Sequence, residues 1–178
     1  QQPENTDAHQ LLSGVYFGRR EFQLAERHLT EAARFKPELN LQLAVLKQKL
    51  QRDPAAILSS AQLAVNALSK KLEQDRGESL TRMTLAEAQI VAGDHAAARE
   101  TLVAGLQQSD DPKLKKRLAD FDLQIIDQRL KDSELHRDAC VPLVIAALRL
   151  DPSNVTGQQM LARLQSLGAR IPADSLQS

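Results

Sequence analysis

The side chains that could do chemistry are scattered along the chain and form no familiar catalytic or metal-binding pattern. The candidate ligands are His9, His28, His95, His136 and the single cysteine, Cys140. His136 and Cys140 are four residues apart and would share a helix face, but zinc needs a third or fourth ligand. The chain has no glycine-rich phosphate loop and no nucleophile elbow. The sequence therefore indicates no enzyme, no catalytic residue, no metal and no cofactor.

The composition predicts that helices carry these side chains. Apolar residues make up 42% of the chain and aromatic residues only 3%, while Leu, Ala, Gln and Glu are abundant, which favours an all-α fold. Lys plus Arg equals Asp plus Glu at 23 each, so no net field would attract nucleic acid. No segment is apolar over the ~18 residues that a membrane span needs, so we expect no membrane insertion.

Two local features have a plain interpretation and an alternative. Residues 113–117 are rich in lysine and arginine, and we interpret them as a solvated helix face, with a phosphate or lipid contact as the alternative. Cys140 lies among apolar residues and is expected to be a small core residue, with a reactive thiol as the alternative. A single cysteine excludes a disulfide within the chain.

The clearest pattern lies in residues 8–36, which predict two antiparallel helices. Large and small residues recur at helical spacing on one face of 8–18 and on one face of 21–36. The connection over 18–21 is short, so the helices must lie side by side, and Pro37 prevents continuation. The residues expected at this contact are Leu12, Ser13, Tyr16, Ala25, Leu29 and Ala32.

These residues also occupy positions of a known repeat signature of about 34 residues. The matching positions are His9 in the tryptophan place, Leu12, Ser13 in the glycine place, Tyr16, Ala25, Leu29 in the phenylalanine place, and Pro37. The segment thus resembles the tetratricopeptide repeat (TPR) family, with degenerate repeats. The resemblance implies a right-handed α-solenoid of antiparallel helix pairs.

Weaker copies of the same pattern follow along the chain. A first helix near 43–50 precedes a long helix over 54–75, which begins at Asp53-Pro54 and ends at 76–78. A third pair surrounds the turn at 92–95, and a fourth begins with a helix over 113–134. Its partner contains Cys140, although Pro142 puts the start of that helix in doubt. A last helix over 155–167 would cap the end of the stack, and Asn154 is interpreted as its cap rather than as a glycosylation site.

We therefore expect about four units plus a capping helix in one domain over residues 8–168. Residues 1–7 and 169–178 are expected to be a flexible N-terminal segment and a flexible tail. The chain opens with Gln1 rather than methionine, which is consistent with a removed upstream segment. A cytoplasmic location is favoured; a periplasmic location, or anchoring through such a segment, stays open.

The resemblance also implies a concave groove lined by the first helix of each pair. The groove residues carried over from the family's ligand-facing places are Gln10, Leu11, Gly14, Phe17, Ala44, Val45, Gln48, Gln51, Met83, Thr84, Glu87 and Ile90. The Lys/Asn/Arg clamp of the chaperone-binding members is missing from these places. An apolar, amide-rich groove is better matched to a helix or an extended apolar peptide. The alternative is that residues of this set pack between neighbouring repeats, namely Leu11, Val45, Met83 or Ile90.

The functional expectation is a non-enzymatic adaptor or assembly scaffold that binds a protein or peptide partner in this groove. The alternative is a self-associating or spacer module of a larger protein, whose groove is filled by its own chain. The irregular spacing of the repeats gives this alternative weight, and it leaves a homodimer open. The sequence does not name the partner or the pathway.

Overall fold

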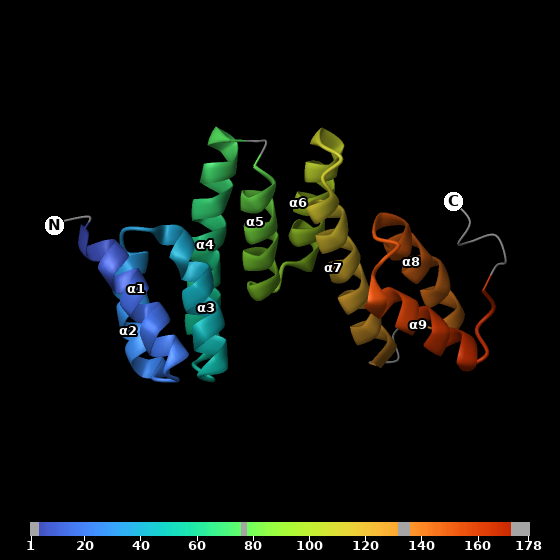
Figure 1. Ribbon diagram of the computed structural model, residues 1–178, viewed down its shortest axis with the longest axis horizontal. Coiled ribbons are helices and arrows are strands. Elements are labelled where there is room, and N and C mark those ends of the chain that lie inside the picture. Colours follow the sequence, from blue (N-terminus) through green and yellow to red (C-terminus); the bar gives the residue numbers. More distant parts are fainter. Residues whose placement is uncertain (1–3, 76–77, 132–135, 172–178) are drawn as a thin grey trace. The chain divides into compact units, whose positions relative to one another are not determined.

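The computed structural model describes residues 4–75, 78–131 and 136–171, and within these ranges every regular element is helical (Figure 1). The expected break at 76–77, the last residues of the expected 113–134 helix and the tail from 172 onward lie outside the described residues. The chain divides into two compact units, the first ending at Thr101 and the second beginning at Leu102. Each unit is described below by itself.

The first unit contains helices α1 to α5 and the start of α6. Their bounds are α1 Glu4–Gly18, α2 Phe22–Ala33, a 3-10 turn Pro37–Leu39, α3 Asn40–Lys49, α4 Pro54–Gln74, α5 Ser79–Val91 and α6 His95–Gln108. The second unit contains the end of α6 and α7 Pro112–Lys131, α8 Arg137–Leu150 and α9 Val155–Ser166. The predicted all-α organisation in helix pairs is confirmed.

Side-chain caps explain where several helices begin. The backbone N–H of Ala55 donates to the Asp53 carboxylate at 3.4 Å, and Pro54 follows at the first helical position, as predicted for α4. The Asp94 carboxylate accepts from the Ala97 N–H at 3.0 Å. Asn154 caps α9 by accepting from the Gly157 N–H at 3.0 Å, which confirms its interpretation as a helix cap.

Four helices, α1, α3, α5 and α9, end in the same turn. The second residue after each helix has a left-handed backbone, and the N–H of the residue that follows it bonds back to a carbonyl five residues earlier, which is the Schellman motif. The left-handed residues are Arg20 (φ 62°), Gln51 (φ 53°), Gly93 (φ 83°) and Gly168 (φ 89°). The repeated turn marks equivalent ends of the repeating units, although only two of the four positions carry glycine.

Small residues in the core of the first unit let the helices approach closely. Ala25 and Ala32 on α2 are fully buried and pack with Leu43 and Leu46 of α3. A second cluster joins α3, α4 and α5 through residues that include Leu41, Ala64, Leu68, Leu85 and Ala88. The helix faces predicted for α2 are therefore core faces.

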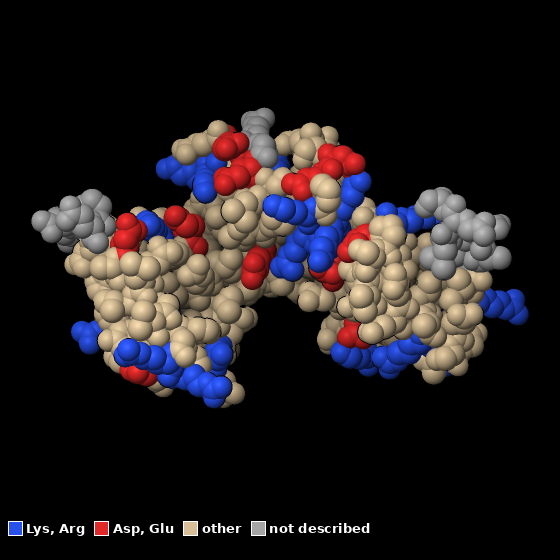
Figure 2. Space-filling model, viewed as in Figure 1, with Lys and Arg blue, Asp and Glu red and all other residues tan. Residues whose placement is uncertain are grey.

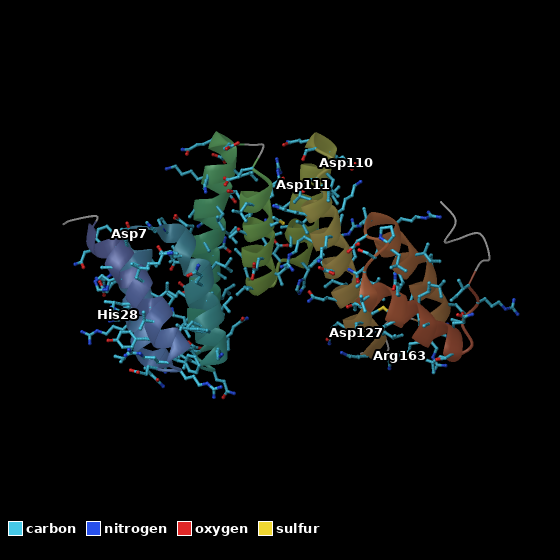
Figure 3. All side chains as sticks on the ribbon, viewed as in Figure 1. Asp7, His28, Asp110, Asp111, Asp127 and Arg163 are labelled. Atoms are coloured by element: carbon cyan, nitrogen blue, oxygen red, sulfur yellow. The ribbon has the colours of Figure 1, made fainter. Side chains whose placement is uncertain are left out.

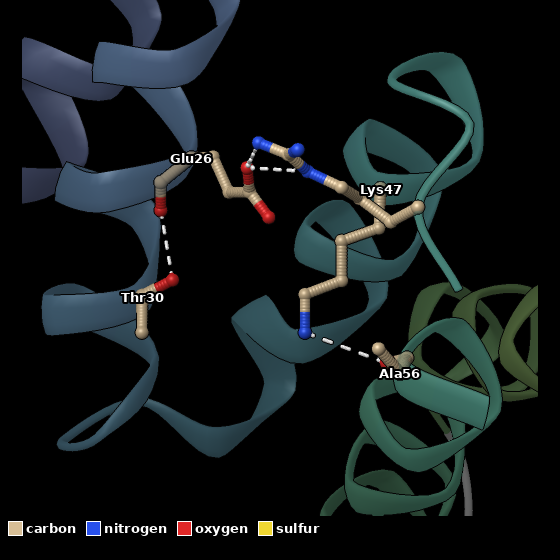
Figure 4. A network of polar contacts seen from close by, with 5 residues as sticks. Glu26, Thr30, Lys47 and Ala56 are labelled. Atoms are coloured by element: carbon tan, nitrogen blue, oxygen red, sulfur yellow. Dashed lines mark hydrogen bonds and ion pairs between the residues drawn. The ribbon is translucent and has the colours of Figure 1, made fainter. Parts of the chain in front are cut away.

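Polar contacts tie the turn between α3 and α4 to its neighbours (Figure 4). Arg52 donates two hydrogen bonds to the Glu26 carboxylate of α2, at 3.2 and 2.8 Å. The Lys47 ammonium donates to Ser60 Oγ at 2.9 Å and to the Ala56 carbonyl at 3.4 Å. Lys47 stands where the repeat signature expects a small residue, and these contacts explain how α3 and α4 accommodate it.

The core of the second unit is built by α7, α8 and α9. Leu123, Cys140, Val144 and Leu164 are almost completely buried there, so Cys140 is a core residue as predicted. Burial raises the pKa of the Cys140 thiol. Pro142 lies inside α8, because the helix already begins at Arg137. The Pro142 side chain is exposed.

Described residues at both ends of the chain make contacts with the rest of their unit. Helix α1 begins at Glu4 and takes in residues 4–7, where Lys36 donates to the Asp7 carboxylate at 2.6 Å. At the other end, Ala169 is buried against the core of the second unit, just after the left-handed Gly168.

Candidate functional site

A groove with a volume of about 1070 Å³ runs along the first helices of the pairs in the first unit. Helix α1 contributes Asp7, Gln10, Leu11, Ser13, Gly14 and Phe17. Helix α3 contributes Leu41, Gln42, Val45, Leu46 and Lys49, and α5 contributes Thr84 and Glu87, with Leu29 of α2 at the base. All of these residues belong to the first unit, so the groove is complete within one compact body.

The groove brings together seven of the twelve residues predicted from the sequence. They are Gln10, Leu11, Gly14, Phe17, Val45, Thr84 and Glu87. Of the other five, Ala44 is fully buried and therefore does not line the groove. Gln48, Gln51, Met83 and Ile90 are at least partly exposed but lie outside the groove lining. Gln51 misses it because α3 has already ended.

Sequence reasoning found only Val45 among the five groove-lining residues of α3 and missed the other four. Leu41, Gln42, Val45 and Lys49 are spaced so that they lie on one face of α3, whereas the predicted positions assumed a fixed repeat length. Helical spacing around Val45 would have found Gln42 and Lys49. Ser13 and Leu29 also line the groove. The sequence analysis assigned both residues to the contact between α1 and α2.

Three apolar side chains of the groove lining are strongly exposed. Leu11 is 72% exposed, Phe17 45% and Val45 43%. Exposed apolar groups that share one groove typically mark a place where another molecule binds, since water contacts them unfavourably. The remaining lining supplies amide and hydroxyl groups, among them Gln10, Gln42 and Thr84.

The two ends of α1 differ in charge. Near its start, Lys36 neutralises Asp7 through the 2.6 Å ion pair. Near its end, the Lys49 ammonium lies over two aromatic rings, 5.0 Å from the Phe17 centroid and 4.6 Å from the Phe22 centroid. The rings themselves meet edge to face, with centroids 5.4 Å apart. Lys49 is thus held by cation–π contacts rather than by a carboxylate.

A histidine pair joins α1 to α2 outside the groove lining. His9 and His28 share a hydrogen bond, and the His28 ring stacks on Tyr16 with centroids 5.3 Å apart. Burial lowers the pKa of His28 from its ordinary value, and the neighbouring charges of His9 and Arg27 lower it further. Figure 3 shows where the His28 side chain lies in the first unit.

A smaller pocket of about 480 Å³ lies between α7 and α9 in the second unit. Its polar lining includes Arg117, Asp120, Asp127, Gln159 and Arg163, of which Asp127 and Arg163 are labelled in Figure 3. Both carboxylates are engaged: Asp120 accepts from Asn154 at 2.6 Å, and Asp127 pairs with Lys131 at 2.5 Å. No sequence-predicted site residue lies in this pocket.

Within the described ranges, no three metal-ligating side chains come together. In the same part of the chain, none of the helices has the length and apolar character needed to cross a membrane.

The fold and the groove define a class of protein, the all-α helical-repeat solenoid built from TPR-like helix pairs. Among solved structures, the chain is similar to the crystal structure of MamA protein, a TPR-containing protein. The match has a TM-score of 0.53 and 14% sequence identity, and it covers 93% of this chain and 83% of that chain. At this identity the likeness concerns the fold. No family model and no curated protein matches the sequence.

Proposed function

We propose that the chain is a protein-interaction scaffold or adaptor that binds a partner polypeptide in the groove along α1, α3 and α5. The observation that carries this proposal is the exposure of Leu11, Phe17 and Val45 in one groove within one compact unit. Complete burial of a fully exposed apolar side chain contributes about 1.5–3 kcal/mol, so the exposed parts of these three side chains supply apolar anchors for a partner.

The polar part of the lining suits a polypeptide. Gln10 and Gln42 carry amides that both donate and accept, and Thr84 adds a hydroxyl. Such groups can pair with polar side chains or free backbone groups of an inserted segment, while the apolar anchors supply the affinity. A helix that lays an apolar face into a groove is a common form of this recognition.

The test compares capture of partners by three forms of the chain. The native chain, a Leu11→Glu, Val45→Glu variant and a Leu58→Glu control are each used for affinity capture from a lysate of the source cell. Leu58 is 48% exposed on α4 but lies outside the groove lining, so it matches the chemistry of the change. Helicity of all three is verified by circular dichroism.

A protein retained by the native chain and the control, and lost by the groove variant, supports the proposal. Equal recovery by all three forms contradicts it. Light scattering on the purified chain addresses the alternative function. A stable dimer that Leu11→Glu, Val45→Glu dissociates would assign the groove to self-association instead.

A further inference from the structure

We propose that the partner segment carries aspartate or glutamate residues at one end, and that this end lies beside Lys49, while its apolar residues lie along Leu11 and Val45. The inference rests on the proposed function and specifies the chemistry of the partner. It is argued from the charges at the end of the groove where α1 and α3 finish.

Helices α1 and α3 run in the same direction in the first unit (Figure 1), so Phe17 and Lys49 lie at the same end of the groove. The cation–π contact between these two residues fixes this arrangement. Arg19 and Arg20 follow α1 directly and are exposed. Lys49 of the groove lining and the exposed Arg19 and Arg20 define the basic end of the groove. Figure 2 shows more Lys and Arg than Asp and Glu side chains along the lower edge of the first unit, where α1 and α3 end in Figure 1.

The cations of the basic end are not neutralised. Among the described residues, no carboxylate forms an ion pair with Arg19, Arg20 or Lys49. By contrast, nearby Arg52 is paired with Glu26 at 2.8 Å, and Lys36 at the opposite end of the groove is paired with Asp7. The helix dipole favours cations at the C-terminal ends of helices. It does not explain why two aromatic rings hold the Lys49 ammonium at the groove wall.

The carboxylates of the groove lining disfavour acidic residues of the partner beside them. Asp7 is engaged by Lys36, and Glu87 on α5 is exposed and would repel a like charge. Acidic residues are thus attracted at the α1–α3 end and disfavoured beside α5. The groove therefore favours a segment that has apolar residues in its middle and carboxylates at one end only.

The test uses a displayed library of random peptides of about 15 residues, long enough for four helical turns. The library is selected on the full chain and depleted on the Leu11→Glu, Val45→Glu variant, so that only groove-dependent peptides remain. Selected peptides are synthesised in two forms, as found and with each Asp and Glu replaced by Asn and Gln. Both forms are titrated against the native chain, Lys49→Gln and the control Lys70→Gln, an exposed lysine of α4 outside the groove lining.

We expect acidic residues to be enriched at one end of the peptides and the amide forms to bind the native chain about three- to tenfold more weakly. Lys49→Gln should abolish most of this difference, and Lys70→Gln should preserve it. Groove-dependent peptides without acidic enrichment, or amide forms that bind equally well, would overturn the inference and leave the proposed function standing. If no groove-dependent peptide is selected, both the inference and the peptide-binding function fail.

Discussion

The Nδ1 atoms of His9 and His28 lie 2.8 Å apart, so a single proton between the two rings joins α1 to α2. One ring must donate and the other must accept, which requires that at least one of the two histidines be neutral. Stacking of Tyr16 on His28 holds the His28 ring in place. The contact between α1 and α2, which forms one wall of the groove, therefore contains a titratable hydrogen bond.

Mild acid is expected to destabilise the first unit. Burial and the charges of His9 and Arg27 place the pKa of His28 below its ordinary value of 6.5 in the folded chain. The unfolded chain then binds more protons than the folded chain at pH values between the two pKa values, so the free energy of unfolding falls as pH falls through this window. Above about pH 6.5 this contribution to stability is fully present.

Thermal unfolding followed at about pH 7.5 and about pH 5.5 checks this expectation. The midpoint should fall at the lower pH, and His28→Gln should reduce the fall because the titrating group is gone. The exposed His136 provides the matched control, since His136→Gln should keep the full pH dependence. An unchanged pH dependence in His28→Gln would show that the pair does not contribute.

Replacing the left-handed residues after α1 and α3 by glycine is expected to stabilise the chain. Arg20 and Gln51 pay the steric cost of a left-handed backbone, which glycine avoids. Arg20→Gly or Gln51→Gly should raise the free energy of unfolding by about 0.5–1 kcal/mol, after allowance for the greater freedom of glycine in the unfolded chain. Urea titration measures the change.

The opposite substitution supplies the control. Gly93 has a φ of 83°, and a methyl group there would meet no neighbouring atom, so Gly93→Ala should destabilise through backbone strain alone. Gly14 lies inside α1 with equally open space, and Gly14→Ala should stabilise by about 0.5–1 kcal/mol. Equal signs for the two changes would contradict the strain argument.

The sequence predicted the helices well where local signals are strong, and the groove only in part. Asp53 and Pro54 marked the start of α4, because a capping carboxylate and a proline act locally. The left-handed backbone at Arg20 and Gln51 could not be predicted, since neither residue is glycine. Helical spacing places Lys49 on the groove face, but its cation–π contacts could not be predicted because the two rings lie on other helices. Two expectations stay predictions. The first is that residues 8–168 form a single domain, and the second is that the groove binds a peptide.

Asn154 is expected to be a stability determinant of the second unit. Its side chain accepts from the Gly157 N–H and donates to Asp120 at 2.6 Å, and the residue is almost completely buried. Asn154→Ala should lower the free energy of unfolding by about 1–3 kcal/mol, because both the cap and the partner of Asp120 are lost. Calorimetry of the variant checks the value.

Asn154→Asp separates these two roles. An aspartate keeps the cap but places a carboxylate next to Asp120 and Asp151, which the native amide contacts at 2.6 and 3.4 Å. The variant should therefore be less stable than the native chain at neutral pH and recover part of the difference in acid, where these groups are protonated. Stability equal to that of the native chain would indicate that the Asp120 contact contributes little.

A comparison of Leu11 with Leu46 distinguishes a binding surface from a core. Both leucines line the groove, but Leu11 is 72% exposed and Leu46 only 3%. Leu46→Ala should lower the free energy of unfolding by about 2–5 kcal/mol, since it leaves a cavity between α2 and α3. Leu11→Ala should change it by no more than about 0.5 kcal/mol, because an exposed side chain makes few contacts to lose.

Binding of a groove-selected peptide should instead weaken by about tenfold in Leu11→Ala, which removes an apolar anchor worth about 1.4 kcal/mol or more. Denaturation and peptide titration on the same preparations measure both quantities. A Leu11→Ala variant that loses stability but keeps its affinity would mean that Leu11 supports the fold rather than the partner.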